Sequence, residues 1–304
     1  MKTPLLESPR LNDRLGGRLL IKPECLQRTG SFKFRGAFNK IVQIPDDDKS
    51  RGVVAFSSGN HAQGVAAAAQ ILGLPATIVM PSDAPAIKIT STQSYGATVV
   101  PYERKDGNRV QLAERILGET GGSMVPPYND FDVIAGQGTI GLEIAEQAST
   151  LGTPLDVVLG PSSGGGMLSG VATALGVVSS DTIVHSVEPA FYDDIAQSLE
   201  AGKRIEIETG RPSVCDALLV EMPGDLTFEI MKARVTSGFS VSDDDALAAV
   251  KLAFEEFKIV LEPSGAIALA AVLTGKVDIQ NKTAGVVCTG GNVDPDLFTR
   301  ALNY

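Results

Sequence analysis

The sequence predicts an α/β protein with mostly parallel sheets, and three observations carry that prediction. Short apolar segments of strand length alternate with helical segments along most of the chain. Glycine-rich or polar turns follow several predicted strands, as they do where a parallel strand leads into a helix. The alternation occurs in two stretches, one on each side of about residue 130, which favours two sheets.

The clearest unit lies between Gly52 and Pro81. Strand VVAFS precedes the polar turn SSGN and an alanine-rich helix that ends at Leu72, where Gly73 stops it. Strand ATIVM completes a strand–helix–strand unit. The pattern continues with a helix at 86–95, a strand at 97–102, a helix at 109–119 and a short strand at 123–126.

The second stretch begins after Asp130. It contains a helix at 133–147, a strand at 155–160, a helix at 167–176 and a strand at 182–189. A late helical stretch runs from Asp243 to about Thr274, with a break near Glu262 and Pro263, because proline interrupts a helix. The last predicted strand is AGVVC, which leads into TGG.

Composition points to a globular protein with a small-molecule partner. The 304 residues are 43% hydrophobic and 20% charged, enough for one large or two smaller domains. A net charge of -10 disfavours nucleic acid and anionic membranes. The apolar runs are shorter than the about 18 to 20 residues that span a bilayer, so we expect a cytoplasmic protein. Cys25, Cys215 and Cys288 form no CxxC pair, and we expect them to be reduced.

Three turns are candidates for chemistry, because ligands of parallel sheets bind where strands end and helices begin. They are SSGNH at 57–61, PSSGGGM at 161–167 and CTGGN at 288–292. The run Ser163 to Gly166 can bring several N–H groups close to a phosphate, although such turns also serve tight packing. Lys33 lies between two phenylalanines, where a lowered pKa would make its amine a nucleophile or base. Composition alone does not distinguish this role from that of a surface lysine.

Eight motifs in order resemble those of the serine/threonine dehydratases, including serine racemase, among the tryptophan-synthase-β-like (fold-type II) pyridoxal 5'-phosphate (PLP) enzymes. The resemblance extends nearly from end to end. The motifs are TPLLESP at 3–9, KPECLQRTGSFKFRGA at 22–37, SSGNHAQG at 57–64, AGQGTIGLEI at 135–144, GGGMLSG at 164–170, VEP at 187–189, EPSGA at 262–266 and GGNVD at 290–294.

The resemblance implies two domains, each with a mostly parallel open sheet flanked by helices, and PLP in the cleft between them. Residues 1–51 and 130–304 would form the large PLP-binding domain. Residues 52–129 would form a small domain inserted in it. The family usually has a further helix before TPLLESP, and some members have a regulatory domain after GGNVD. This sequence has neither, so we expect no feedback control by such a domain.

The resemblance also assigns the cofactor contacts. Lys33 would form the Schiff base, Phe32 would pack against the PLP ring, and Asn60 would bond the ring hydroxyl. Thr289 would face the pyridine nitrogen, where a neutral hydroxyl favours elimination over long-lived carbanions. Glu262 is a further expected contact. The phosphate would be held by Ser163, Gly164, Gly165, Gly166 and Met167, with Ser163 in place of the usual first glycine.

The substrate contacts and the reaction follow from the same resemblance. Ser57, Ser58, Asn60 and His61 would hold the substrate carboxylate at a helix N-terminus. Lys33 would remove the Cα proton, and Ser58 would lie on the opposite side of Cα, as in the racemases. The expected products are a 2-oxo acid and ammonia.

A divalent cation and a homodimer are also implied. Glu188, Asp194 and the backbone carbonyl of Tyr192 match the family's cation site, and oxygen ligands of this kind suit Mg²⁺ or Ca²⁺. The cation would have a structural role. The homodimer is an expectation by analogy only.

The substrate leaves alternatives open. We expect L-threonine or L-serine, with 3-hydroxyaspartate second, because the segment 215–224 near the substrate side chain supplies Glu221 and no cation. Serine racemisation would use the same site. Cysteine-synthase-type β-replacement uses different motifs around the lysine, and a non-enzymatic α/β nucleotide-binding module would not need Lys33.

Overall fold

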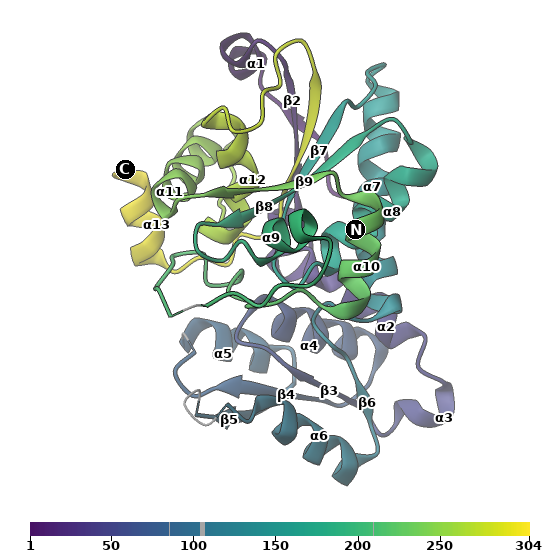
Figure 1. Cartoon of the computed structure of the whole chain (residues 1–304). Coiled ribbons are helices and arrows are strands. Elements are labelled where there is room, and N and C mark those ends of the chain that lie inside the picture. Colours follow the sequence, from purple (N-terminus) through teal and green to yellow (C-terminus); the bar gives the residue numbers. More distant parts are fainter. Residues whose placement is uncertain (85, 104–106, 209) are drawn as a thin grey trace.

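Two sheets, one above the other in the computed structural model of Figure 1, organise the fold. The structure describes residues 1–84, 86–103, 107–208 and 210–304. The larger sheet has six strands, in the order β1 (Leu6–Glu7), β2 (Arg18–Pro23), β10 (Thr283–Cys288), β7 (Val157–Pro161), β8 (Ile183–Pro189) and β9 (Ser237–Val241). The smaller has four, in the order β5 (Thr98–Tyr102), β4 (Ala76–Pro81), β3 (Val53–Phe56) and β6 (Ser123–Met124).

The described strand pairs are parallel except at one edge of the larger sheet, where β1 runs antiparallel to β2. The prediction of two mostly parallel sheets is therefore confirmed. A parallel sheet collects the carboxyl ends of its strands at one edge, so the turns that follow β3, β7 and β10 lie at such edges.

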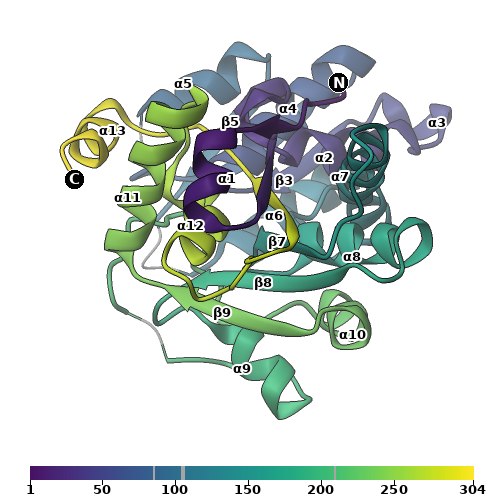
Figure 2. The same cartoon turned by 90° about the horizontal axis from the view of Figure 1, so that it is seen from above.

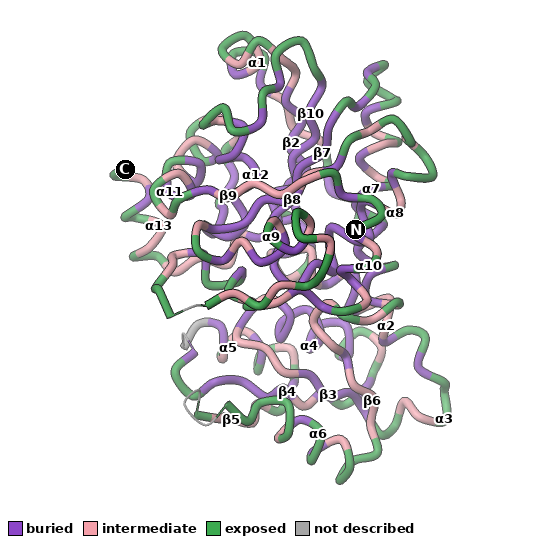
Figure 3. Tube along the Cα trace, viewed as in Figure 1, coloured by how far each residue is buried: buried purple, intermediate pink, exposed green. Residues whose placement is uncertain are grey.

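Helices cover both faces of the larger sheet, as Figures 1 and 2 show. They are α7 (Phe131–Thr150) and α8 (Gly166–Val178) on one face and α11 (Asp243–Leu252) and α12 (Pro263–Leu273) on the other. Because successive strand residues face opposite sides, Leu19 and Ile21 of β2 join the apolar cluster of α11 and α12. Leu20 joins the cluster of α7 and α8. The strands consequently run through the buried centre of this unit (Figure 3).

The smaller sheet is also covered on both faces, by α4 (Asn60–Leu72) and α6 (Arg109–Thr120), with α5 (Ala86–Ser94) beside α4. Val53 and Ala55 of β3 face the cluster of α4, whereas Val54 faces the cluster of α6. Gly73 ends α4 with φ 73°, a left-handed conformation that glycine adopts without strain. The predicted stop of this helix is confirmed.

Helix α2 (Lys33–Val42) lies between the two units. Its residues Phe34, Ala37 and Ile41 belong to the apolar cluster of the smaller sheet. The other side of α2 contacts α7, where the Gly36 N–H donates to Gln137 Oε1 at 3.2 Å. The division of the chain at residues 51 and 130 stays a prediction, and the packing of α2 favours counting this helix with the smaller unit.

Several elements had no clear sequence signal. The short strand β9, SGFSV, has no apolar run, and its hydrogen bonds come from β8. Strands β1 and β2 were also not predicted from the sequence.

The described residues form further helices and turns: α1 (Pro9–Leu15), α3 (Asp46–Lys49), α9 (Asp194–Ala201), α10 (Asp225–Arg234), α13 (Pro295–Leu302), the 3₁₀ turns η1 (Glu24–Leu26) and η2 (Arg28–Gly30), and the π-helical turn η4 (Ala253–Phe257).

The late helical stretch is broken as predicted. It leaves helical geometry at Lys258, whose φ is 58°, and α12 starts at Pro263. Within the described ranges, we find no helix with the length and apolar content that a membrane span requires.

Candidate active site

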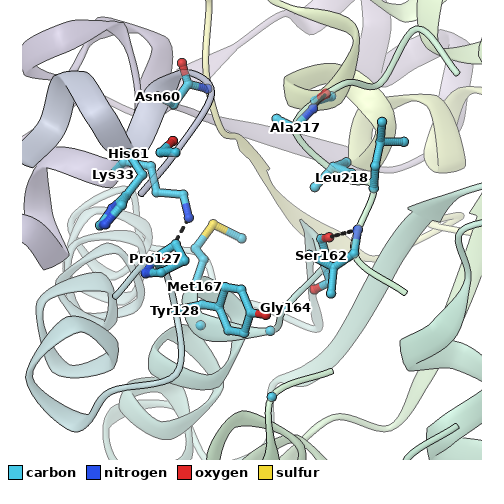
Figure 4. Close-up of a pocket in the computed structure, with 18 of the residues that line it drawn as sticks. Lys33, Asn60, His61, Pro127, Tyr128, Ser162, Gly164, Met167, Ala217 and Leu218 are labelled. Atoms are coloured by element: carbon cyan, nitrogen blue, oxygen red, sulfur yellow. Dashed lines mark hydrogen bonds between the residues drawn. The ribbon is translucent and has the colours of Figure 1, made fainter. Parts of the chain in front are cut away.

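One cavity of about 550 Å³ brings the predicted cofactor and substrate residues together. Its lining includes every residue that the sequence assigned to those two roles. They are Phe32, Lys33, Ser57, Ser58, Asn60, His61, Ser163, Gly164, Gly165, Gly166, Met167, Glu262 and Thr289. In Figure 4, Lys33, Asn60 and His61 lie on one side of this cavity, and Ala217 and Leu218 lie across from them.

Backbone hydrogen bonds hold the Lys33 segment at the carboxyl end of β10. The Phe32 N–H donates to the Thr289 carbonyl at 3.1 Å, and Ser31 pairs with Gly290 in an isolated bridge. Lys33 then opens α2 directly after this contact. The backbone of Lys33 is therefore held next to Thr289.

The Lys33 amine is held in an apolar setting. Its Nζ donates to the Pro127 carbonyl at 2.8 Å and lies 5.2 Å from the centre of the Phe32 ring (Figure 4). Burial lowers the pKa of Lys33 to about 8, because removing water disfavours the ammonium form. A substantial fraction of the amine is therefore neutral near pH 8 and can act as a nucleophile or a base.

The glycine turn before α8 has the shape of an anion cradle. A Cβ on Gly164 would lie 2.5 Å from the Tyr128 ring, so only glycine fits there. Gly165 has φ 91°, and no side chain caps the helix that follows. The free N–H groups at the start of α8 can therefore face a phosphate.

Ser163 occupies the place of the first glycine of this turn, and its side chain does not fill the cradle. The hydroxyl accepts a hydrogen bond from the Val220 N–H at 3.1 Å. The turn is thereby joined to the segment 215–224, which forms the opposite wall of the cavity. The Ser163 hydroxyl hydrogen can still be donated elsewhere.

Two further groups suit a pyridine ring with a hydroxyl substituent. The Asn60 Nδ2 donates to Glu262 Oε1 at 2.6 Å, which leaves its second hydrogen for another acceptor. Burial raises the pKa of Glu262 to about 7, and its Oε2 is buried without a hydrogen-bond partner among the described residues. Thr289 is buried and lines the same cavity. These residues, the cradle and Lys33 fit PLP.

His61 is neutral, which limits what its side chain can do. Its Nε2 donates to the Val125 carbonyl at 2.8 Å, and burial lowers the pKa of His61 to about 3. The unprotonated Nδ1 can only accept a hydrogen bond. A substrate carboxylate would therefore be held by N–H groups at the start of α4, not by the imidazole.

The cavity also contains cations that the sequence did not assign to it. Segment 215–224 itself has none, but Lys88, Arg109 and Arg204 line the cavity from other parts of the chain. Lys88 and Arg109 follow the ends of β4 and β5, so the edge rule that singled out SSGNH could have found them. Arg204 lies in an irregular segment that carries no local signal.

These three side chains differ in the contacts that they already make. Lys88 pairs with Asp216 at 2.5 Å, and this carboxylate outweighs burial and raises the pKa of Lys88. The Arg204 Nε donates to the Pro223 carbonyl at 2.8 Å. The Arg109 guanidinium lies 5.8 Å from the centre of the Phe56 ring.

The predicted cation ligands lie outside the cavity, where β8 ends and α9 begins. Glu188 and Asp194 are both fully buried. Glu188 accepts from the N–H groups of Ile195 and Ala196, at 3.0 and 2.8 Å. Both Asp194 carboxylate oxygens lack a hydrogen-bond partner among the described residues. The Tyr192 hydroxyl donates to the Arg211 carbonyl at 2.7 Å.

Two buried neighbouring carboxyls repel each other when both are ionised. Burial raises the pKa of Glu188, and the charge of Asp194 raises it further. Burial also raises the pKa of Asp194 to about 8. No group of three or more His, Cys, Asp or Glu side chains suited to a metal was found among the described residues, so a cation here would also need carbonyl or water ligands.

Comparisons with known proteins identify the family of the chain. The model of the pyridoxal-phosphate dependent enzyme family matches residues 1–290. The chain is 43% identical to an L-threonine ammonia-lyase of Thermotoga maritima, covering 99% of this chain and 74% of that protein. It is 41% identical to an L-threo-3-hydroxyaspartate ammonia-lyase of Saccharomyces cerevisiae, covering 99% and 91%. The solved structure of maize serine racemase superimposes with a TM-score of 0.93 at 36% identity, covering 100% and 92%.

The pKa of Lys33 predicts how cofactor attachment depends on pH. Attachment of PLP to the cofactor-free protein should speed up as pH rises, with a midpoint near 8 and not near the ordinary 10.5, because only the neutral amine attacks. Stopped-flow absorbance at several pH values measures this midpoint. A midpoint at or above pH 10 would contradict the burial that we assign to the amine.

Proposed function

The chain belongs to the family of pyridoxal-phosphate dependent enzymes, and from this premise we propose that it is an ammonia-lyase acting on a small 3-hydroxy amino acid. The products would be a 2-oxo acid and ammonia. The observation that carries the proposal is the meeting of three groups in one cavity: a lysine of lowered pKa, a glycine cradle for phosphate and a helix N-terminus for a carboxylate. Because the chain belongs to an enzyme family, we set aside the alternative of a non-enzymatic nucleotide-binding module.

The chain's own residues would perform the binding and proton transfers. PLP, when bound, supplies an electron sink for the electrons of the Cα–H bond. Lys33 would hold the cofactor through Nζ, and the same atom would take the Cα proton of the substrate. The turn at 57–61 would hold the substrate carboxylate by N–H groups, and the cradle at Ser163–Met167 would hold the phosphate.

L-threonine or L-serine remains the first choice of substrate. The wall that faces Lys33 and Asn60 in Figure 4 includes Ala217 and Leu218, and Leu219 and Val220 continue it along the cavity. Such an apolar wall suits a hydrogen or methyl group on the substrate's third carbon. The similarity to an L-threonine ammonia-lyase supports the same choice.

The cations in the cavity favour a second candidate, 3-hydroxyaspartate. Its extra carboxylate would need a positive partner, and Arg109 lines the cavity without an ion pair to any carboxylate that the structure describes. The similarity to an L-threo-3-hydroxyaspartate ammonia-lyase fits this candidate. Serine racemisation stays a third possibility, because Ser58 lines the cavity as that reaction requires.

The buried acidic pair supports a structural cation. Asp194 has two buried oxygens without partners, and a divalent cation would neutralise the repulsion between Asp194 and Glu188. We assign Mg²⁺ or Ca²⁺ to this pair, with the Tyr192 carbonyl as a third ligand. A homodimer and a cytoplasmic location complete the proposal, the first by analogy and the second from composition.

The central test replaces the lysine. Lys33→Ala should abolish the visible absorption of bound PLP and lower 2-oxo acid formation from L-serine or L-threonine by at least about 10² to 10⁴, the usual contribution of a positioned proton-transfer group. The matched control is Lys40→Ala on the same helix, whose amine pairs with Asp130 and Asp132 outside the cavity. Wild-type protein that retains no PLP absorption after unbound PLP has been removed would refute the proposed function.

Substrate choice is tested at Arg109. Arg109→Met should lower kcat/KM for 3-hydroxyaspartate by about tenfold or more, the effect of one charge-assisted hydrogen bond, and leave L-threonine within about twofold. Arg115→Met is the control, because this exposed arginine of the same helix pairs with Glu119. Equal losses for both substrates would exclude Arg109 as the partner of a second carboxylate.

Removal of the cation should lower stability. Mg²⁺ or Ca²⁺ should raise the Tm of the wild type, since a ligand at one hundred times its Kd contributes about 2.7 kcal/mol to the free energy of unfolding. Asp194→Asn should lose this response and, without cation, should be at least as stable as the wild type, because it buries one charge fewer. Asp193→Asn should keep the rise in Tm. A wild type whose Tm does not change with either cation would disprove the site.

A further inference from the structure

A row of amide groups runs from a backbone carbonyl to the wall of the cavity. Asn292 Nδ2 donates to the Thr29 carbonyl at 2.8 Å and to Asn60 Oδ1 at 2.7 Å. Asn60 Nδ2 in turn donates to Glu262 Oε1 at 2.6 Å. The row links α4 of the smaller unit to the segments that carry Glu262 and Asn292 in the larger one.

The direction of every hydrogen bond in this row follows from its first member. A backbone carbonyl can only accept, so Asn292 must present its NH₂ group to Thr29. The same NH₂ group reaches Asn60, which must therefore present its oxygen. The NH₂ group of Asn60 is then turned toward Glu262. Packing alone would not select this orientation, because the two ends of an amide have nearly the same size.

The position of Asn292 is itself fixed by its surroundings. A Cβ on Gly30 would lie 2.6 Å from Asn292 Oδ1, so the absence of a side chain at Gly30 makes room for the amide. Thr29 and Gly30 both have positive φ, 64° and 71°, which turns the Thr29 carbonyl out of the regular chain direction. Asn292 thus lies between a strained turn and Asn60.

We propose that Asn292 is a positioning residue that keeps the NH₂ end of Asn60 directed at the ligand in the cavity. One hydrogen of that group is used by Glu262, and the other is free for an anionic oxygen, which in the proposed function is the ring oxygen of PLP. The inference rests on that function. It assigns to Asn292 a role that depends on the direction of its hydrogen bonds and not on its contacts alone.

Two variants remove the NH₂ group of Asn292 without adding a charge. Asn292→Leu has a similar shape, and Asn292→Ala serves if the leucine variant does not fold. In either variant Asn60 can reverse its amide, so the Kd for PLP should rise about five- to tenfold, the effect of one lost hydrogen bond. Asn303→Leu makes the same change at an exposed amide of the last turn and should keep the wild-type Kd.

A second readout needs no cofactor. In the wild type the Asn60 NH₂ group stabilises ionised Glu262, so the pKa of Glu262, followed by carbonyl NMR in the cofactor-free protein, should rise in Asn292→Leu. A purely structural role of Asn292 would lower Tm and leave this midpoint unchanged. An unchanged Glu262 midpoint or an unchanged Kd for PLP overturns the proposal. Wild type that fails to bind PLP refutes the proposed function, while the Glu262 midpoint still shows whether the row has this direction.

Discussion

The attachment of the Ser31–Lys33 segment to the end of β10 is the constraint on which the site depends. The Phe32 N–H bond to Thr289 and the bridge between Ser31 and Gly290 place the start of α2 at the edge of the larger sheet. Helix α2 then packs against α4 on one side and α7 on the other. One short segment therefore sets the position of the reactive amine relative to both sheets.

Burial at this junction shifts the pKa of a basic group and the pKa of an acidic group in opposite directions. It lowers the pKa of Lys33 to about 8 and raises that of Glu262 to about 7, because each loses hydration of its charged form. Both groups can thus change protonation near neutral pH, as proton transfer requires. Among the described residues, both cations and acids line the cavity, and Lys88 is already paired with Asp216.

Several contacts between the two units involve residues that line this cavity. Lys88 of α5 pairs with Asp216, and Asn60 of α4 bonds Glu262 and Asn292. Within the larger unit, the Ser163 hydroxyl joins the cradle to the wall at 215–224 by accepting from the Val220 N–H. Filling the cavity would therefore act on the same groups that hold the units together.

The alternating elements, the mostly parallel sheets and the turns that line the cavity could be predicted from the sequence, because apolar periodicity, glycines and motif order are local properties. The roles of Lys33 and of the glycines at 164–166 rested on the family resemblance of those motifs. Other features become visible in the folded chain alone: the position of Arg204 at the cavity, the burial that keeps His61 neutral, and the pairing of β9 with β8. These depend on burial and on contacts between residues far apart in the chain, which a local pattern does not contain.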